Sequence, residues 1–331
     1  MMKRVIGIGN ALVDVMTRLN DYSILERLGY PGGSMQLVDL QESERIKSET
    51  AGFVESLTPG GSAANTVHGL AMLGMESGFI GSVGSDYVGD LFEKELKKAG
   101  VDAILKRRSS PTGTAVAMIT PDSERTFATH LGAAVELSLD DISPLQMDGY
   151  HILYLEGYLI INYELVKRAC ETARSLGMKV AVDLASYNVV ENFREQFNDL
   201  VDNYADIVFA NEEEALALTG QPTEEALDNL ALRCDIAVVK TGSRGSLIRR
   251  GDEKVRVGVL GVNPVDTTGA GDLYAAGFLY GLAQDEPLDI CGAMGTLLAG
   301  NVIEVMGPKM DLERWKRITG EILAMGKPSG D

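Results

Sequence analysis

The sequence is poor in the residue types that build metal and disulfide sites. Its three cysteines, Cys170, Cys234 and Cys291, are odd in number and far apart, which excludes a disulfide framework and a zinc pattern. The three histidines are equally scattered, so we expect no histidine-based metal site. Unpaired cysteines of this kind are typical of a reducing compartment and favour a cytoplasmic protein.

Positive charge and long apolar runs are also scarce. The chain has 30 Lys and Arg against 48 Asp and Glu, a net charge of −18. Because nucleic-acid binding requires clustered basic residues, this balance argues against a nucleic-acid partner, although it leaves room for a small phosphorylated ligand. No run approaches the roughly 18 apolar residues of a spanning helix, and the N-terminal run has no signal-peptide cleavage site. We therefore expect no membrane association.

The 331 residues are 45% hydrophobic, which is enough for a large core. Short runs rich in Val and Ile alternate with helical segments such as 86–100 and 163–177, where apolar residues recur every three to four positions. Such uninterrupted runs suit strands buried on both faces. We predict an α/β fold with a doubly wound, mostly parallel sheet and helices on both faces. The predicted strands are 5–10, 78–84, 151–157, 179–185, 206–211 and 236–242.

Two stretches interrupt this alternation. The first, from residue 14 to about residue 50, has little helical pattern before ESERIKSETAG. The second, GTAVAMITPDSERTFATHL, has the pattern of two strands around a PDSE turn. We interpret both as parts of a small antiparallel β lid at one edge of the main sheet. The predicted boundaries are 14–50 and 112–131 for the lid, and 1–13, 51–111 and 132–331 for a large nucleotide- and substrate-binding domain.

Polar residues follow almost every predicted strand. Ligands of open parallel sheets bind outside the carboxyl ends of the strands, so these residues mark the expected site. Loops between strands and helices are also polar because they supply helix caps, and at any single position that explanation is equally good. The residues concerned are Asn10, Asp14, Glu156, Asp183, Asn211, Glu214, Lys240, Thr241 and Gly242.

The segment DTTGAGD (266–272) precedes LYAAGFLYGLAQ, a run without a polar face that predicts a buried helix. The start of a buried helix has unpaired N–H groups and a partial positive charge that need a partner. Gly269, Ala270 and Gly271 are small enough to let an anion approach these groups. Asp272 is then either a carboxylate that interacts with the helix dipole or a base that accepts a proton from a hydroxyl nucleophile.

Two other glycine-rich interpretations fail on spacing. A Walker-type loop requires GxxxxGK followed by Ser or Thr, and the chain contains no such run. Gly7 and Gly9 follow a predicted strand, as in a dinucleotide-binding fingerprint, but Leu12 stands at the third glycine position. A nicotinamide-dependent enzyme is therefore not expected.

Several motifs together resemble those of one family. NPVDTTGAGDLYAAGFLYG resembles the second signature of the ribokinase-like (PfkB) carbohydrate and nucleoside kinases, and PGGSAANTVHGLAMLG resembles their first. GNALVD, FANEEEA and VKTGSRGS follow the family order across most of the chain. With SERTF, HLGAA and EGYL, the set is most similar to the adenosine-kinase-like branch.

The resemblance implies an ATP-dependent kinase that transfers the γ-phosphoryl group to a hydroxymethyl group of a sugar or nucleoside. Magnesium would assist, with a potassium ion as in some relatives. By this resemblance Asp272 is the catalytic base, and Gly269, Ala270 and Gly271 stabilise the phosphoryl group. The lid would close over the substrate and exclude water.

The same resemblance implies the residues that bind each ligand. Those for the acceptor substrate are Asn10, Asp14, Gly60, Gly61, Asn65 and the lid residue Arg125. Those for the nucleotide are Asn211, Thr241, Gly242, Gly245 and Asn301. Those for metal ions are Glu214, which would hold magnesium through water, and Asp266, at a monovalent cation site.

Simpler structural roles stay open for some of these residues. Asn211 and Glu214 have the spacing of a helix capping box. Lys240, near the expected phosphate site, fits a solvated lysine at the end of a strand. Asn301 fits a core amide with its hydrogen bonds satisfied, and Arg125 fits a surface arginine paired with an acid.

Three functional hypotheses remain at this point. A nucleoside kinase would need an aromatic residue in the lid to stack on the base, and Phe127 and Phe53 are the candidates. A ribose or fructose kinase would have a smaller and more polar pocket. A non-catalytic relative is disfavoured by the intact Asp272 and GAG. Lid strands can pair between subunits, so a homodimer through the lid is also open.

Overall fold

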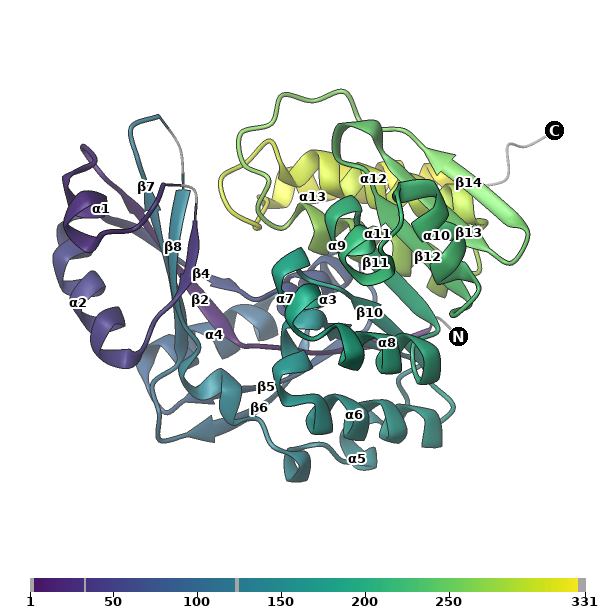
Figure 1. Ribbon diagram of the computed structural model, residues 1–331, viewed down its shortest axis with the longest axis horizontal. Coiled ribbons are helices and arrows are strands. Elements are labelled where there is room, and N and C mark those ends of the chain that lie inside the picture. Colours follow the sequence, from purple (N-terminus) through teal and green to yellow (C-terminus); the bar gives the residue numbers. More distant parts are fainter. Residues whose placement is uncertain (1–2, 33, 123–124, 327–331) are drawn as a thin grey trace.

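The computed structural model describes residues 3–32, 34–122 and 125–326 (Figure 1). Its larger sheet has nine strands within these residues, and the seven from β12 to β6 are mutually parallel. Two antiparallel strands, β13 and β14, extend one edge. The order is β14 (Glu253–Val257), β13 (Ser246–Arg250), β12 (Ile236–Lys240), β11 (Ile207–Asn211), β10 (Lys179–Asp183), β9 (Ile152–Glu156), β1 (Val5–Ile8), β5 (Ser77–Gly84) and β6 (Asp102–Arg108).

Helices cover both faces of this sheet and bury two separate apolar clusters. Alternate residues of one strand enter different clusters: Tyr154 of β9 joins one, whereas Leu153 and Leu155 join the other. The first cluster lies under α3 (Ser62–Met72), α4 (Tyr87–Lys98), α11 (Ala270–Ala283), α12 (Leu288–Val302) and α13 (Leu312–Met325). The second lies under α5 (Pro144–Met147), α6 (Tyr163–Ser175), α7 (Tyr187–Asn192), α8 (Arg194–Asn203), α9 (Glu212–Thr219) and α10 (Thr223–Ala231).

The predicted fold class is confirmed. Each of the six predicted strands corresponds to a strand of the large sheet, which is one or two residues shorter than predicted or, for β5, one residue longer. The predicted helices 86–100 and 163–177 correspond to α4 and α6. The hairpin of β13 and β14 was not predicted. No helix in the described ranges has both the length and the apolar character needed to cross a membrane.

A second sheet stands apart from the large body at the left of Figure 1. Its β7–β8 pair is the antiparallel hairpin predicted around PDSE, whereas β2 runs parallel to β7 and β3 parallel to β8. Two helices, α1 (Ser23–Leu28) and α2 (Leu40–Thr50), contribute to its apolar cluster. The order is β3 (Met35–Leu37), β8 (Arg125–His130), β7 (Gly113–Ile119), β2 (Leu12–Arg18) and β4 (Val54–Gly60).

The division of the chain into a large domain and a lid at 14–50 and 112–131 stays a proposal. β4 (Val54–Gly60) pairs with β2 in the small sheet, although the predicted boundaries assign it to the large domain. β4 leads directly into α3 of the large body. A strand that belongs to the small sheet and ends at the large one gives the two parts a short, stiff connection.

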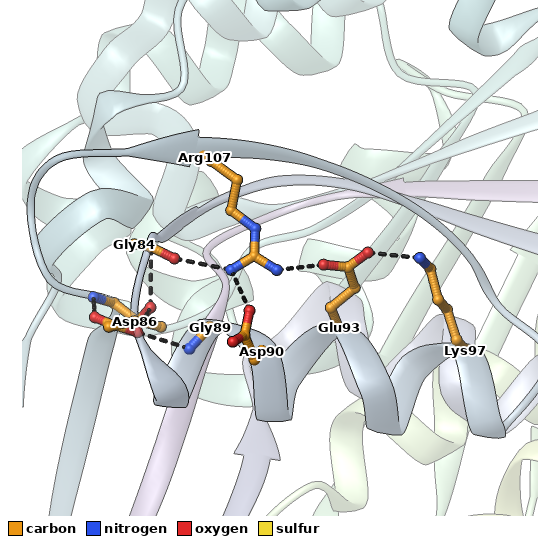
Figure 2. A network of polar contacts seen from close by, with 8 residues as sticks. Gly84, Asp86, Gly89, Asp90, Glu93, Lys97 and Arg107 are labelled. Atoms are coloured by element: carbon orange, nitrogen blue, oxygen red, sulfur yellow. Dashed lines mark hydrogen bonds and ion pairs between the residues drawn. The ribbon is translucent and has the colours of Figure 1, made fainter.

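A second connection runs through Asp86, the N-cap of α4 (Figure 2). One carboxylate oxygen accepts hydrogen bonds from Gly89 N (2.8 Å) and Thr112 Oγ1 (2.7 Å), and the other accepts from Thr112 N (2.8 Å). Gly84 N, at the end of β5, donates to Thr112 Oγ1 (2.9 Å). Asp86 thus fixes the residue that precedes lid strand β7 to the large sheet.

Figure 2 also shows a row of ion pairs along α4. Arg107 of β6 donates to Gly84 O (3.0 Å) and pairs with Asp90 and Glu93, and Lys97 pairs with Glu93. The Asp90 side chain is 72% exposed, and exposed pairs of this kind contribute little to stability. The partly buried hydrogen bonds of Asp86 to Thr112 are therefore the stronger constraint.

We predict that Asp86→Ala lowers the free energy of unfolding by about 2–4 kcal/mol. The change removes a helix cap, worth about 0.5–2 kcal/mol, and leaves the buried Thr112 N–H without its acceptor, at about 1–3 kcal/mol. Denaturant titration measures the loss. Asp90→Ala on the same helix is the control and should change stability by less than about 1 kcal/mol. Equal effects of the two substitutions would contradict the assignment.

Candidate active site

A cavity of about 1030 Å³ lies at the carboxyl ends of the parallel strands, between the two sheets. β1 is flanked by β5 on one side and β9 on the other, so the chain order reverses beside it. Ligands of doubly wound folds bind at such a reversal. The wall includes residues that follow β1, β9, β10, β11 and β12, the start of α11, and residues of β2, β7 and β8 in the small sheet.

The start of α11 opens into this cavity. Its N-cap, Gly269, has a φ of 77°, and a Cβ at this position would lie 2.7 Å from Pro308 Cβ, so only glycine fits. No side chain caps the helix within the described residues. Gly269, Ala270 and Gly271 all line the cavity. The helix start is therefore shaped to receive an anion at its N–H groups.

The Asp272 carboxylate lies beside these N–H groups and is held by two side chains of α3. Ser62 Oγ donates to its Oδ1 (2.7 Å) and Asn65 Nδ2 donates to its Oδ2 (2.9 Å). Burial raises the pKa of Asp272, and the two hydrogen bonds oppose that rise. A fixed carboxylate with a raised pKa is suited to accept a proton from a hydroxyl group.

One side-chain atom of Asn65 has no hydrogen-bond partner in the described part of the chain. Its Oδ1 is buried and has no hydrogen-bond partner within the described residues, while its Nδ2 is bound to Asp272. α3 begins after Gly61, which has a φ of 91°, and a Cβ there would collide with Asn10 O. A buried acceptor without a partner costs free energy, so Asn65 Oδ1 fits a hydroxyl group of a ligand.

Glu156, at the end of β9, joins two parts of the site that the sequence assigns to substrate binding. It accepts hydrogen bonds from Asn10 N (2.8 Å), Asn10 Nδ2 (2.7 Å) and Ala63 N (2.9 Å). Burial raises its pKa to about 7, although these three bonds stabilise the ionised form. The position of Glu156 after a strand was noted in the sequence, but its role as the link between Asn10 and α3 was not predicted.

Lys240 differs from the expected solvated lysine. Its side chain is only 16% exposed and forms an ion pair with Asp183 of β10 at 2.8 Å. Burial alone would lower the pKa of Lys240, but the charges of Asp183 and Glu214 outweigh burial and raise it. The lysine is inside because β10 and β12 flank β11 and end at the same edge of the sheet. Sequence alone does not reveal that neighbour relation.

Asn211 and Glu214 form the capping box that their spacing allows. Both Glu214 oxygens accept from Asn211, from its N and from its Nδ2, each at 2.7 Å. Burial raises the pKa of Glu214 to about 7, and Lys240 opposes the rise. Nowhere in the described ranges do three or more His, Cys, Asp or Glu gather closely enough to hold a metal ion. Glu214 therefore suits magnesium only if phosphate oxygens and water complete the coordination.

The structure brings most of the expected site residues to one cavity. Those that line it are Asn10, Asp14, Gly61, Asn65, Asn211, Glu214, Gly242, Gly245, Gly269, Ala270, Gly271 and Asp272. Gly60 and Thr241 lie next to lining residues without lining the cavity. A Cβ at Gly60 would lie 2.6 Å from the Asp14 carboxylate, and Thr241 binds Gly245 O.

Three further candidates lie elsewhere or outside the described part. Asn301 does not line the cavity: its Nδ2 donates to Leu297 O (2.9 Å) and its Oδ1 accepts from Arg317 (2.6 Å). Asp266 accepts from the N–H groups of Thr268 and Gly307, which joins the loop before α11 to a later turn. The backbone of Arg125 begins β8, but its side chain lies outside the described residues.

A family model, the pfkB family carbohydrate kinase, matches residues 34–315. The chain belongs to the PfkB family. The kinase predicted from the motifs is thus confirmed at the level of a phosphotransferase that acts on an alcohol group of a sugar or nucleoside.

Similar proteins include both kinds of PfkB kinase. A probable sugar kinase from Rhizobium etli CFN 42 is 35% identical, with a TM-score of 0.88 over 97% of this chain and 99% of its own. The adenosine kinase from Sinorhizobium meliloti is also 35% identical, with a TM-score of 0.85 over 97% of this chain and 100% of its own. A 5-dehydro-2-deoxygluconokinase from Geobacillus kaustophilus is 30% identical over 80% of this chain and 85% of its own.

We predict that Glu156→Gln changes how stability depends on pH. The pKa of Glu156 is about 7 in the folded protein, above the value of about 4.3 in an unfolded chain, so the native state binds its proton more tightly. The carboxyl therefore stabilises the fold relatively well at low pH, and that contribution is lost as pH rises from about 4.3 to 7. Glutamine has no such dependence.

Denaturant titrations at pH 5 and pH 8 check this. The stability of wild type minus that of Glu156→Gln should fall by up to about 3 kcal/mol between the two pH values. Glu76→Gln is the control, because this side chain is 75% exposed. The stability of wild type minus that of Glu76→Gln should be the same at the two pH values. A constant difference for Glu156→Gln as well would show that its pKa is ordinary.

Proposed function

We propose that this PfkB kinase is an ATP-dependent nucleoside kinase, which phosphorylates the hydroxymethyl group of the ribose. The observation that carries the proposal is the arrangement around Asp272: a half-buried carboxylate fixed by Ser62 and Asn65 beside a helix start that no side chain caps in the described residues. The substrate class rests on a second observation, the apolar wall of the cavity on the lid side.

The proposed reaction uses Asp272 as the general base. The acceptor hydroxyl gives its proton to Asp272 as its oxygen attacks the γ-phosphorus, and the bond to the β-phosphate oxygen breaks with its electron pair left on ADP. Because phosphoryl transfer demands little covalent chemistry from the protein, positioning and electrostatic stabilisation supply most of the rate. Gly269, Ala270 and Gly271 present the N–H groups that stabilise the charge on the moving phosphoryl group.

The ribose end of the pocket contains the polar residues near α3 and β1. Asn65 Oδ1, the buried acceptor without a protein partner, is suited to a ribose hydroxyl donor. Asp14 and Asn10 line the same end of the cavity, and Asn10 is held in place by Glu156. A carboxylate and an amide offer both acceptors and donors, which suits a vicinal diol.

The lid side of the cavity is more apolar than a free sugar requires. Phe127 of β8 lines it, whereas Phe53, the other aromatic candidate, packs against the apolar cluster of the lid. A nucleobase is flat and apolar on its faces, and an aromatic ring can stack on it. This supports a nucleoside over ribose or fructose. The apolar lining residues of the small sheet and of the segment after it are Leu12, Leu37, Ala115, Phe127, Leu131, Ala134, Val135 and Leu137, and Leu159, Ile161 and Leu165 of the large body also line the cavity.

The ions belong to the proposal as well. Magnesium, held by Glu214 through water and by the phosphates, would neutralise charge on the triphosphate. A potassium site at Asp266 stays a prediction, since both oxygens of this carboxylate already accept backbone hydrogen bonds. A homodimer through the lid also stays a prediction.

We predict that Asp272→Asn lowers kcat by about 10²–10⁴-fold, the usual contribution of a general base. The affinity for ADP should change by less than about threefold, because the N–H groups at the start of α11 remain. A coupled assay of ADP release and calorimetric titration with ADP give the two numbers. Asp289→Asn, an exposed acid on α12, is the control. Turnover near the wild-type rate in Asp272→Asn would remove the base from the mechanism.

We predict that adenosine or inosine is a better acceptor than ribose, fructose or 2-keto-3-deoxygluconate in the same assay. Phe127→Ala should lower kcat/KM for the preferred nucleoside by about 5- to 150-fold, as expected for loss of one base–aromatic stack worth about 1–3 kcal/mol. Phe53→Ala should lower stability without changing acceptor preference. If ribose is preferred and Phe127→Ala has no effect on its kcat/KM, the enzyme is a sugar kinase.

A further inference from the structure

The cavity has an unusual balance of charge. Five acidic residues line it, and among the described lining residues Lys240 is the only Lys or Arg. A nucleoside triphosphate adds several negative charges to this site. Repulsion between phosphate and carboxylates would disfavour both binding and reaction unless a cation lies close to the transferred group. The acidic residues are Asp14, Glu156, Asp183, Glu214 and Asp272.

Lys240 reaches the place where that cation is needed. A Cβ built on Gly271 would lie 3.2 Å from Lys240 Nζ, so the ammonium group is in contact range of the backbone at the start of α11. It extends from the end of β12 into the cavity that Ser62 and Asn65 also line. The loop that receives an anion thus has both the Asp272 carboxylate and the Lys240 ammonium close to it.

The Lys240 side chain is held in one orientation by Asp183. Nζ donates to Asp183 Oδ2 at 2.8 Å, and the Asp183 side chain is only 7% exposed. Asp183 Oδ1 in turn accepts from Ala185 N at 2.9 Å. Ala185 has a φ of 70°, a left-handed conformation that is strained for alanine. Strained backbone of this kind clusters at functional sites. Here the backbone of Ala185 orients Asp183, which in turn orients Lys240.

Within the described residues, Lys240 Nζ makes only this one hydrogen bond. An ammonium group has three N–H donors, so two remain for a ligand. A buried ion pair often stabilises a fold no more than a well-packed apolar pair of similar volume does. Stability alone therefore does not explain why this ion pair lies at the wall of a cavity. The unused donors and their position beside Gly271 therefore point to a ligand oxygen.

Resting on the function proposed above, we propose that Lys240 is a catalytic residue that donates a hydrogen bond to an oxygen of the phosphoryl group during its transfer. Asp183 is the positioning residue that holds it there. In the transfer step the new bond from the acceptor oxygen to the γ-phosphorus forms as the bond to the β-phosphate oxygen breaks. The acceptor proton goes to Asp272, and Lys240 keeps its own protons throughout.

The first test is Lys240→Ala, with Lys254→Ala as the matched control. Lys254 is in β14 and pairs with Glu224 and Asp228, away from the cavity. Lys240→Ala should lower kcat about 10²–10³-fold, as does loss of a single preorganised donor to a transition state. Its ADP affinity should change less than about threefold. Added methylamine or ethylamine should restore part of the turnover, and Lys254→Ala should behave as wild type.

The second test guards against misfolding. Lys240→Ala leaves the buried Asp183 without a counter-ion, which can destabilise the fold. The double variant Lys240→Met with Asp183→Asn removes both charges, and its kcat should be as low as that of Lys240→Ala. A kcat within about threefold of wild type in either variant would overturn the proposal, as would an equal loss of kcat and ADP affinity.

The third readout is the pH profile of Asp183→Asn. The charge of Asp183 helps to raise the pKa of Lys240, so its removal should lower that pKa. The kcat of Asp183→Asn should therefore fall at a lower alkaline pH than that of wild type, whereas a merely structural pair would leave the profile in place. If the wild type phosphorylates none of the acceptors, the proposed function itself fails; if it is active and these variants are too, only the role of Lys240 fails.

Discussion

A half-buried carboxylate beside a helix start without a side-chain cap is the constraint on which the rest of this structure depends. Asp272 and the N–H groups of Gly269 to Gly271 lie together at the start of α11. A carboxylate there repels the anion that the N–H groups attract, so it weakens anion binding unless it takes part in a reaction. Ser62 and Asn65 fix the carboxylate, and the small side chains of residues 269–271 let an anion approach the start of the helix. The start of α11 therefore combines N–H groups that attract an anion with a carboxylate that repels it.

The two sides of the cavity are held together by few buried groups. Glu156 joins the segment after β1 to the start of α3, and Asp86 joins the start of lid strand β7 to α4. Each uses both oxygens of one carboxylate to accept hydrogen bonds from two separate segments. Such bonds strengthen as water leaves, so the same burial that fixes the site also raises the pKa of Glu156. Burial therefore accounts both for the rigidity of the site and for the raised pKa of Glu156.

The sequence predicted the large sheet well because its strands are uninterrupted apolar runs, which only a doubly covered parallel sheet uses. It did not predict β13 and β14, whose residues such as Arg249 and Lys254 carry charge in a strand at the sheet edge. At the site, the rule that ligands bind at carboxyl ends of strands marked Asp183, Glu156 and Lys240 correctly as neighbours of the cavity. Which side chains pair, and which are buried, depends on strand order. That order is a tertiary property with no local signal.

The same reasoning explains how a chain with net charge −18 can hold an anion. Net charge governs long-range attraction in solution, and its electrostatic effect falls off within about a Debye length of roughly 8–10 Å. Inside the cavity, the binding of an anion depends instead on local dipoles and on nearby lysines, of which Lys240 lines the wall. The acids that make the site negative also keep that lysine protonated, because Asp183 and Glu214 raise the pKa of Lys240 against the effect of burial. The acidic wall thus keeps Lys240 protonated beside the start of α11.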